Sequence, residues 1–298
     1  MIRTARLRTN AKINLFLRVM GRRPDGYHEI ETIFHTIGLA DSITIRPATN
    51  GDVDISMEAE PGSMMGLPRS EDNLVREVAR RLIERGARND GVTIEIVKRI
   101  PVGAGLGGGS GNAAGVLASL NELWEMNLDA EALERLALDV GADVPYCLTG
   151  GTSRASGRGE ITTELPGPPA MWFVLGLSDE PLFTAEVYRA FDLERDAGDV
   201  RAAPMSLALG SGDLAEIAAL LHNDLERPAF RARPELEKLK QAMSDAGALG
   251  VVMSGSGPTL VALARDANHA GELAGRLTPL FDRIVTASST PKCIERLD

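Results

Sequence analysis

The sequence has few cysteines and no long hydrophobic run, and each shortage excludes a class of protein. Only Cys147 and Cys293 occur among 298 residues, which excludes a disulfide framework. They form no CxxC pair, and no histidine stands at a metal-ligand spacing from them. No apolar run resembles a signal-peptide core or approaches the roughly 20 residues of a membrane span. We therefore expect a cytoplasmic protein without disulfides, structural zinc or a membrane anchor.

Positive charge is also scarce. The 32 Lys and Arg residues are outnumbered by 42 Asp and Glu residues, which gives a net charge of −10. Because phosphate contacts supply much of the affinity for nucleic acid, this balance argues against a nucleic-acid partner. To bind an anionic ligand, a protein with this net charge needs positive potential from groups at the binding site itself. The composition is otherwise ordinary for a globular protein, with 44% hydrophobic residues, and the length suggests about two domains.

The hydrophobic pattern predicts an α+β fold of two lobes. Apolar residues alternate from Ile13 to Val19, which indicates a strand with Lys12 and Asn14 together on its other face. Further strands and helices follow in both halves of the chain. A Gly/Pro-rich crossing at residues 150–169 is the best candidate for a boundary, and we place the lobes at residues 1–166 and 167–298.

A glycine-rich segment directly precedes an apolar helix that we predict at residues 112–124. The run Pro101-Val-Gly-Ala-Gly-Leu-Gly-Gly-Gly-Ser-Gly-Asn112 holds six glycines in twelve residues. Without Cβ atoms, several backbone N–H groups can turn toward one oxyanion. The helix that follows adds unpaired N–H donors and the positive end of its dipole. The segment therefore predicts a phosphate-binding loop.

Three nucleotide-binding patterns compete for this loop. A Walker A loop requires a lysine that is absent here. Gly103, Gly105 and Gly108 match the dinucleotide fingerprint GxGxxG, which would suggest an NAD-binding oxidoreductase. The preceding strand is half polar, however, and no later strand ends in a ribose-binding acid. The third pattern, P-x-G-x-G-L-G-(G/S)-(G/S)-S before an apolar helix, fits throughout. A flexible linker is disfavoured because the loop opens straight into that helix.

Four separated motifs resemble the GHMP kinase family. They are Ala11-Lys-Ile-Asn-Leu-Phe-Leu17 with Gly21-Arg-Arg-Pro-Asp-Gly-Tyr-His28, the glycine loop, Gly141-Ala-Asp-Val-Pro145, and Ser254-Gly-Ser-Gly-Pro258. The resemblance implies a ribosomal-protein-S5-like N-terminal lobe, a ferredoxin-like C-terminal lobe, and an ATP-dependent small-molecule kinase that uses Mg²⁺. The first motif points, within the family, to phosphorylation of the 2-hydroxyl of 4-diphosphocytidyl-2-C-methyl-D-erythritol in the non-mevalonate isoprenoid pathway.

The resemblance also assigns catalytic roles to individual residues. Asp143 would act on the substrate hydroxyl, and a general base typically contributes about 10²–10⁴-fold to the rate. Lys12 would lie beside Asp143 and draw charge from the γ-phosphate or the incipient alkoxide. Asn14, on the same strand face, would contact the erythritol part of the substrate.

The substrate's cytosine would lie among aromatic side chains. Tyr27 and His28 match the pair that shapes and hydrogen-bonds the cytosine pocket in the family. Tyr188 aligns with the aromatic residue that stacks on the base. Buried polar sites of this kind discriminate strongly against unmatched ligands.

The glycine loop would bind ATP through its backbone. The residues implied are Pro101, Gly103, Ala104, Gly105, Leu106, Gly107, Gly108, Gly109, Ser110 and Gly111. Ser110 is the candidate hydroxyl for phosphate or magnesium. Two positions depart from the family pattern: Asn10 replaces a proline, and Gly111 replaces a second serine, so one hydroxyl is missing.

Each of these residues also has an ordinary structural interpretation. Asp143 before Val144-Pro145 suits a helix N-cap, Lys12 suits a solvated strand, and Tyr188 suits a helix core. Two functional alternatives remain. One is a GHMP kinase that acts on homoserine, mevalonate or a sugar, and the Asp-Gly-Tyr-His segment counts against it. The other is a non-catalytic nucleotide-binding module, and the retention of both Lys12 and Asp143 counts against that.

Overall fold

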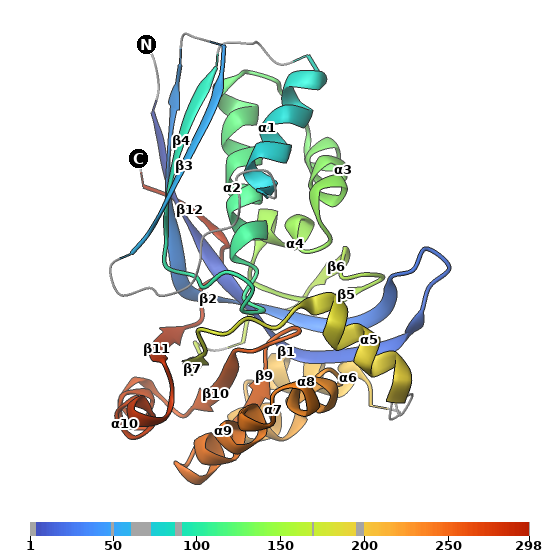
Figure 1. Ribbon diagram of the computed structural model, residues 1–298, viewed down its shortest axis with the longest axis vertical. Helices are drawn as coiled ribbons and strands as arrows, with labels where there is room; N and C mark the ends of the chain where they lie inside the picture. Colours follow the sequence, from blue (N-terminus) through green and yellow to red (C-terminus); the bar gives the residue numbers. More distant parts are fainter. Residues whose placement is uncertain are drawn as a thin grey trace.

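Two β-sheets organise the protein in a computed structural model that describes residues 4–48, 51–60, 73–86, 91–168, 170–194 and 200–297 (Figure 1). The larger sheet has the central order β12-β1-β2-β4-β3, and the smaller has the order β11-β7-β10-β9. The strands of the larger sheet are β1 (Ala5–Arg22), β2 (His28–Pro47), β3 (Val53–Ala59), β4 (Val92–Lys98), β5 (Thr152–Ser156), β6 (Ile161–Glu164), β8 (His222–Asn223) and β12 (Ile294–Arg296). Those of the smaller sheet are β7 (Trp172–Leu177), β9 (Gly250–Met253), β10 (Leu260–Ala264) and β11 (Arg283–Ser288).

The helices divide between the two sheets. Four of them cover one face of the larger sheet in the upper part of Figure 1: α1 (Leu74–Glu84), α2 (Gly108–Leu123), α3 (Ala130–Val140) and α4 (Val144–Thr149). The others accompany the smaller sheet and the β1–β2 hairpin: α5 (Thr184–Glu194), α6 (Ala202–Ser211), α7 (Leu214–Leu220), α8 (Glu226–Ala232), α9 (Pro234–Asp245), α10 (Ala267–Leu277) and the 3₁₀ turn η2 (Thr278–Leu280). The fold is the expected two-lobed α+β architecture. Within the described ranges, no helix has the length and apolar character needed to cross a membrane.

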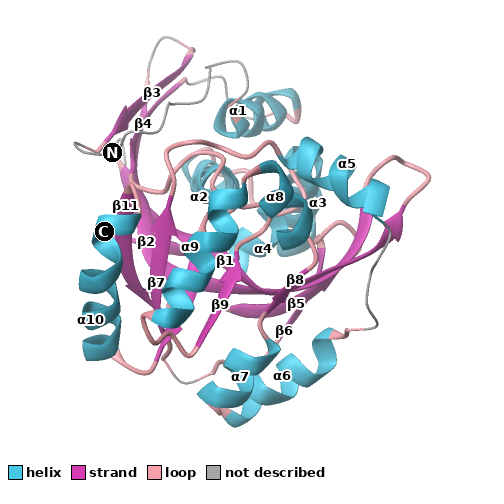
Figure 2. Cartoon of the chain, turned by 60° about the horizontal axis from the view of Figure 1, so that its bottom comes forward, coloured by secondary structure: helices cyan, strands magenta, loops and turns pink. Residues whose placement is uncertain are grey.

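The β1–β2 hairpin connects the two lobes. Its strands have 18 and 20 residues, and its outer end projects beside α5 in both views (Figures 1 and 2). Register shifts interrupt the pairing at Asn10/Ala11, Asn14/Phe16 and Val19/Gly21. Such bulges bend a strand and re-aim its side chains, so both faces of β1 can be buried.

A hydrophobic core spans the junction of the lobes. Ile13 and Leu15 on β1 are fully buried in one cluster with Phe173 on β7 and Met205 on α6. The predicted boundary at residues 166 and 167 lies in the connection between β6 and β7, and it remains a prediction. The chain does not divide cleanly there, because β8 and β12 both return to pair with β1.

Candidate functional site

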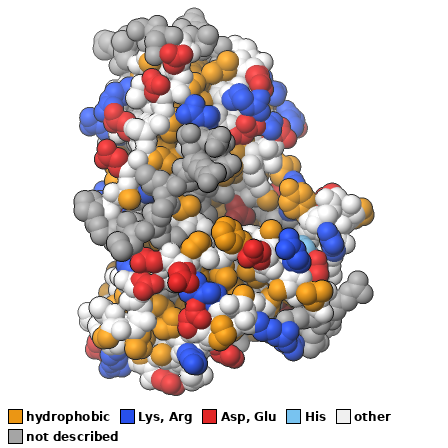
Figure 3. Space-filling model, viewed as in Figure 1, with side chains coloured by type: hydrophobic (Ala, Val, Ile, Leu, Met, Phe, Trp, Pro, Cys, Tyr) orange, Lys and Arg blue, Asp and Glu red, His pale blue; other side chains and the backbone are white. Residues whose placement is uncertain are grey.

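A cavity of about 930 Å³ lies where β1, β2, α5 and the glycine-rich loop meet. Six residues singled out from the sequence line it: Lys12, Asn14, Tyr27, His28, Asp143 and Tyr188. A second cavity of about 280 Å³ adjoins it and is lined by the loop from Pro101 to Ser110. Gly103, Gly105 and Gly107 line both cavities. Figure 3 shows the molecule hollowed between its upper and lower parts, with hydrophobic and charged side chains mixed around the hollow.

Lys12 and Asp143 form an ion pair inside the larger cavity. The ammonium Nζ of Lys12 lies 3.3 Å from Oδ2 of Asp143 and donates a 2.9 Å hydrogen bond to Oδ1 of Asn14. Asn14 in turn donates to the Thr32 hydroxyl at 2.8 Å. The Lys12 side chain is only 5% exposed, so it is not a solvated strand lysine, whereas Asp143 is 31% exposed and reaches the cavity.

Asp143 stands at the N-cap position of α4 but does not cap the helix. Its side chain accepts no capping hydrogen bond from the N–H groups of α4. The carboxylate instead faces Lys12, as its 3.3 Å distance shows. The ordinary N-cap interpretation therefore does not describe this residue. A carboxylate released from capping is free to accept a proton or a hydrogen bond from a ligand.

The glycine-rich segment ends in the first turn of α2, which begins at Gly108. The helix thus begins four residues before the predicted start at residue 112. Glycine has a low helix propensity, so the sequence pattern concealed the first turn. Gly103, Gly105 and Gly107 have positive φ angles of 71°, 76° and 68°. The early start places the N–H groups of the loop at a helix N-terminus, where they have no intrahelical acceptor.

Ser254 braces the loop from the second lobe. Its hydroxyl donates to the Gly105 carbonyl at 2.9 Å and lies 3.3 Å from the Asn14 backbone N–H. A Cβ atom on Gly105 would lie 2.1 Å from the Ser254 carbonyl, and one on Gly107 would lie 2.7 Å from Cγ of Lys12. Glycine is required at both positions, because the loop packs directly on the second lobe and on Lys12.

Lys98 contributes positive charge to the smaller cavity, a role that was not predicted from the sequence. It lines that cavity and forms a buried ion pair with Asp41. Asp41 also accepts hydrogen bonds from the N–H groups of Arg99 and Ile100, at 2.8 and 2.9 Å. A Cβ atom on Gly108 would lie 3.1 Å from Nζ of Lys98, so this ammonium stands beside the first residue of α2. The available signal was a lysine at the end of an alternating strand.

Aromatic side chains gather at the other end of the larger cavity. The rings of His28 and Tyr188 stack with centroids 4.6 Å apart. Nε2 of His28 lies 2.7 Å from Oδ1 of Asp192, one helical turn beyond Tyr188 on α5. Burial raises the pKa of Tyr188, so its hydroxyl stays protonated at neutral pH. The i, i+4 spacing from Tyr188 was the signal that could have found Asp192.

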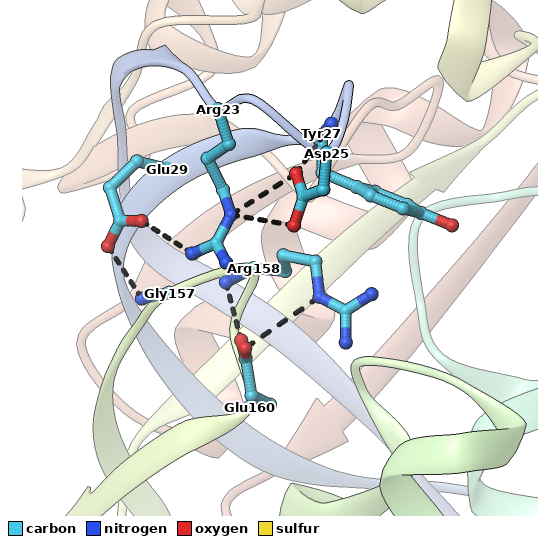
Figure 4. A network of polar contacts seen from close by, with 7 residues as sticks. All are labelled: Arg23, Asp25, Tyr27, Glu29, Gly157, Arg158 and Glu160. Atoms are coloured by element: carbon cyan, nitrogen blue, oxygen red, sulfur yellow. Dashed lines mark hydrogen bonds and ion pairs between the residues drawn. The ribbon is translucent and has the colours of Figure 1, made fainter.

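The tip of the β1–β2 hairpin is held to the turn between β5 and β6 (Figure 4). Arg23 donates to Glu29 at 2.7 Å, and Glu29 accepts from the Gly157 N–H at 3.0 Å. The guanidinium of Arg158 lies 4.9 Å from the centre of the Tyr27 ring, which is 57% exposed. Arg158 was not predicted from the sequence, because the Gly-Arg-Gly turn in which it lies matches no known ligand-binding pattern.

Ser110 lies half-buried in the first turn of α2 and lines the smaller cavity. Within the described ranges, no three His, Cys, Asp or Glu side chains gather closely enough to hold a metal ion. These residues therefore offer no cation site built from protein carboxylates alone. The hydroxyl of Ser110 fits a divalent ion that arrives on the phosphates of a bound nucleotide.

Comparison with known proteins places the chain in a family. The models for the GHMP kinases N terminal domain and the GHMP kinases C terminal region match residues 73–151 and 205–281. The 4-diphosphocytidyl-2-C-methyl-D-erythritol kinase of Gloeobacter violaceus is 41% identical over 90% of this chain and 88% of its own length. That of Pelotomaculum thermopropionicum is 41% identical over 95% and 97%.

Solved structures agree with the sequence comparison. A crystal structure of 4-(cytidine 5′-diphospho)-2C-methyl-D-erythritol kinase is 35% identical, with a TM-score of 0.77 over 97% of this chain and 99% of that one. The mevalonate kinase of L. major has a TM-score of 0.78 over 97% of each chain, but at 18% identity it shows the shared fold alone. The chain therefore belongs to the GHMP kinase family of ATP-dependent small-molecule kinases.

Proposed function

We propose that this protein transfers the γ-phosphoryl group of ATP to the 2-hydroxyl of 4-diphosphocytidyl-2-C-methyl-D-erythritol, giving the 2-phosphate and ADP. This reaction belongs to the non-mevalonate route to isoprenoid precursors. One observation carries the proposal. The Lys12–Asp143 pair lies in a single cavity between a phosphate-type loop and an aromatic end that suits a nucleobase. The named activity of the full-length relatives supports it.

The loop would hold the donor. Backbone N–H groups at the start of α2 would bind the phosphates of ATP, aided by the ammonium of Lys98 and the helix dipole. The hydroxyl of Ser110 would contact a phosphate or Mg²⁺. An Mg²⁺ ion bound with the nucleotide would neutralise part of the negative charge of its phosphates.

Asp143 and Lys12 would act at the acceptor hydroxyl. The hydroxyl oxygen forms a bond to the γ-phosphorus while the bond from that phosphorus to the leaving oxygen of ADP breaks. The hydroxyl proton passes to Asp143, which acts as general base. Lys12, held by Asn14 and Asp143, stabilises the negative charge on the transferred group.

The aromatic end would hold the cytosine. Tyr188 and Tyr27 offer ring faces for stacking, and His28 offers hydrogen-bonding groups to the base edge. Asn14 would contact the methylerythritol, since it lies beside Lys12 and Asp143. In this arrangement the base would bind at the aromatic residues and the acceptor hydroxyl at the Lys12–Asp143 pair of the same cavity.

The test is ADP release with ATP, Mg²⁺ and the proposed acceptor, for wild type and Asp143→Asn. The variant keeps the size of the side chain but removes the base, so kcat should fall about 10²–10⁴-fold while ATP binding persists. The control is Asp139→Asn, which changes an exposed aspartate at the end of α3 and should leave turnover unchanged.

Absence of turnover in folded, ATP-binding wild type would refute this acceptor. A panel of homoserine, mevalonate and sugars would then identify another acceptor within the same family. A wild-type rate retained by Asp143→Asn would instead refute the role of Asp143 and leave the acceptor standing.

A further inference from the structure

Three arginines line the larger cavity around its aromatic end. We propose that Arg22, Arg158 and Arg189 form a subsite for the diphosphate group of the acceptor substrate, an inference that rests on the proposed function. None of the three was expected from the sequence, and each reaches the cavity from a different part of the fold: the β1–β2 hairpin, the β5–β6 turn and α5.

The charged side chains that line the cavity favour an anionic ligand. Four cationic side chains line it, Lys12 with the three arginines, against two carboxylates. Both carboxylates are already engaged, since Asp143 faces Lys12 and Asp192 contacts His28. The side chains that line the cavity therefore carry an excess of two positive charges in a protein whose net charge is −10, and Glu160, the acid beside Arg158, is not part of that lining. A diphosphate that joins two alcohols carries one negative charge on each phosphate and would balance this excess.

Contacts with Glu160 and Tyr27 fix the guanidinium of Arg158 in a position where it can bind a phosphate. Its Nε lies 3.7 Å from Oε1 of Glu160, and its guanidinium lies 4.9 Å from the centre of the Tyr27 ring (Figure 4). The structure gives its two terminal amino groups no partner in the described part of the chain. A guanidinium fixed by stacking and by its Nε can present those two groups to one phosphate in a bidentate contact.

Arg22 and Arg189 flank the stacked rings. Arg22 pairs directly across the hairpin with His28, and such opposed residues share one face of the sheet. Arg189 follows Tyr188 on α5 and lines the cavity with it. Neither guanidinium has a carboxylate partner among the residues that the structure describes, although acids are abundant in the chain. Both are therefore available to an anionic ligand.

The β5–β6 turn also joins the aromatic end to the reacting end. Arg158 lies against Tyr27, while a Cβ atom on its neighbour Gly159 would lie 3.7 Å from Oδ1 of Asp143. In the proposed substrate the diphosphate lies between the cytidine and the methylerythritol. A base near Tyr27 and an acceptor hydroxyl at Asp143 thus place the phosphates alongside this turn.

The experiment is calorimetric titration of cytidine and CDP into the protein saturated with ADP, which occupies the donor side. We expect wild type to bind CDP at least about tenfold more tightly than cytidine, and to lose this preference as salt is added. The triple variant Arg22→Gln, Arg158→Gln, Arg189→Gln should bind both ligands equally. Arg158→Lys should retain part of the preference, because it keeps the charge but not the bidentate geometry.

The matched control is Arg135→Gln, an exposed helical arginine on α3 outside the cavity, which should keep the wild-type preference. Thermal unfolding verifies that each variant is folded. A triple variant that still prefers CDP would overturn the subsite, as would a wild type that binds cytidine and CDP alike. Wild type that binds neither ligand would contradict the cytidine pocket itself, and would therefore refute the proposed acceptor together with the subsite.

Discussion

At the scale of single residues, His28 makes two kinds of contact, a ring stack and a polar contact with a carboxylate. Its ring stacks on Tyr188, and its Nε2 lies 2.7 Å from a carboxylate oxygen of Asp192. A carboxylate can only accept at that distance, so the hydrogen resides on Nε2 and Nδ1 remains for another partner. Asp192 thus orients the imidazole of His28, and we do not assign it a direct contact with the cytosine base.

We predict that His28→Ala raises the KM for the cytidylyl substrate far more than the KM for ATP. Asp192→Asn should do the same to a smaller degree, because the amide cannot fix the imidazole as a carboxylate does. Steady-state kinetics with each substrate varied in turn measures both constants. Equal increases in the two KM values would show that these residues support the fold rather than the base pocket.

His35 is a titratable residue that lines neither of the two cavities. It is buried between the hydroxyls of Thr152 and Ser289, each at 2.8 Å, and burial lowers its pKa from 6.5 to about 4. The unfolded chain therefore takes up a proton at His35 at pH values where the folded protein does not. The corresponding stability is present in full above pH 6.5 and is lost as the pH falls toward 4.

We predict that this single histidine accounts for about 3 kcal/mol of the free energy of unfolding lost between pH 7 and pH 4. Urea unfolding across this range measures the loss. His35→Gln, which keeps a polar group in the same place, should be less stable than wild type at pH 7 but should lack this part of the pH dependence. The same loss in both proteins would disprove the assignment to His35.

At the scale of elements, the alternation from Ile13 to Val19 predicted the middle of β1 but not its full extent, Ala5–Arg22, and the start of α2 was predicted too late. Alternation placed Lys12 and Asn14 on one face, and the hydrogen bond between them confirms it. It did not reveal the bulge between Asn14 and Phe16, because a bulge leaves no periodic signal. The first turn of α2 consists largely of glycine, whose intrinsic preference opposes the helix that tertiary packing enforces.

We predict that Gly105→Ala strongly destabilises the protein, whereas Gly109→Ala does not. At Gly105 the added Cβ would lie 2.1 Å from the Ser254 carbonyl at a φ of +76°, so the two lobes would have to separate. At Gly109, inside α2, the nearest atom would be Leu74 Cδ1 at 3.8 Å, and alanine favours a helix by about 0.5–1 kcal/mol. Thermal unfolding compares them, and similar melting temperatures would count against the close packing.

At the scale of the whole molecule, the sequence indicated two lobes but not how they interlock. Local patterns predict a strand wherever apolar residues alternate, yet they carry no signal for its partner. The pairing of β12 with β1 joins Thr9 to Ile294, and the Asn10 side chain reaches the Lys292 carbonyl at 2.9 Å. The two cavities could likewise be anticipated only in part, because Arg158 and Asp192 reach the larger one, and Lys98 the smaller one, through tertiary packing.

We predict that removing residues 291–298 lowers both the melting temperature and kcat, although residues 291–297, the part of this segment that the structure describes, do not line the larger cavity. The deletion eliminates β12 and the hydrogen bond from the Asn10 N–H to the Cys293 carbonyl, 2.7 Å, two residues before Lys12. The control Arg296→Ala removes only a surface ion pair with Glu122 and should change stability by less than about 1 kcal/mol. Unchanged turnover in the shortened protein would contradict this coupling.

The position of β1 between β2 and β12 also has a consequence for biosynthesis. A ribosome makes the segment around Cys293 and Ile294 more than 280 residues after Thr9, its partner region on β1. At about 5–20 residues per second, the part of β1 around Thr9 waits roughly 15–60 seconds for that partner, longer than the Phe16–Leu17 part that pairs with β8. During translation, this edge of β1, three residues from Lys12, therefore stays open until β12 is made, and the nascent chain depends on that strand, or on a chaperone, to protect it.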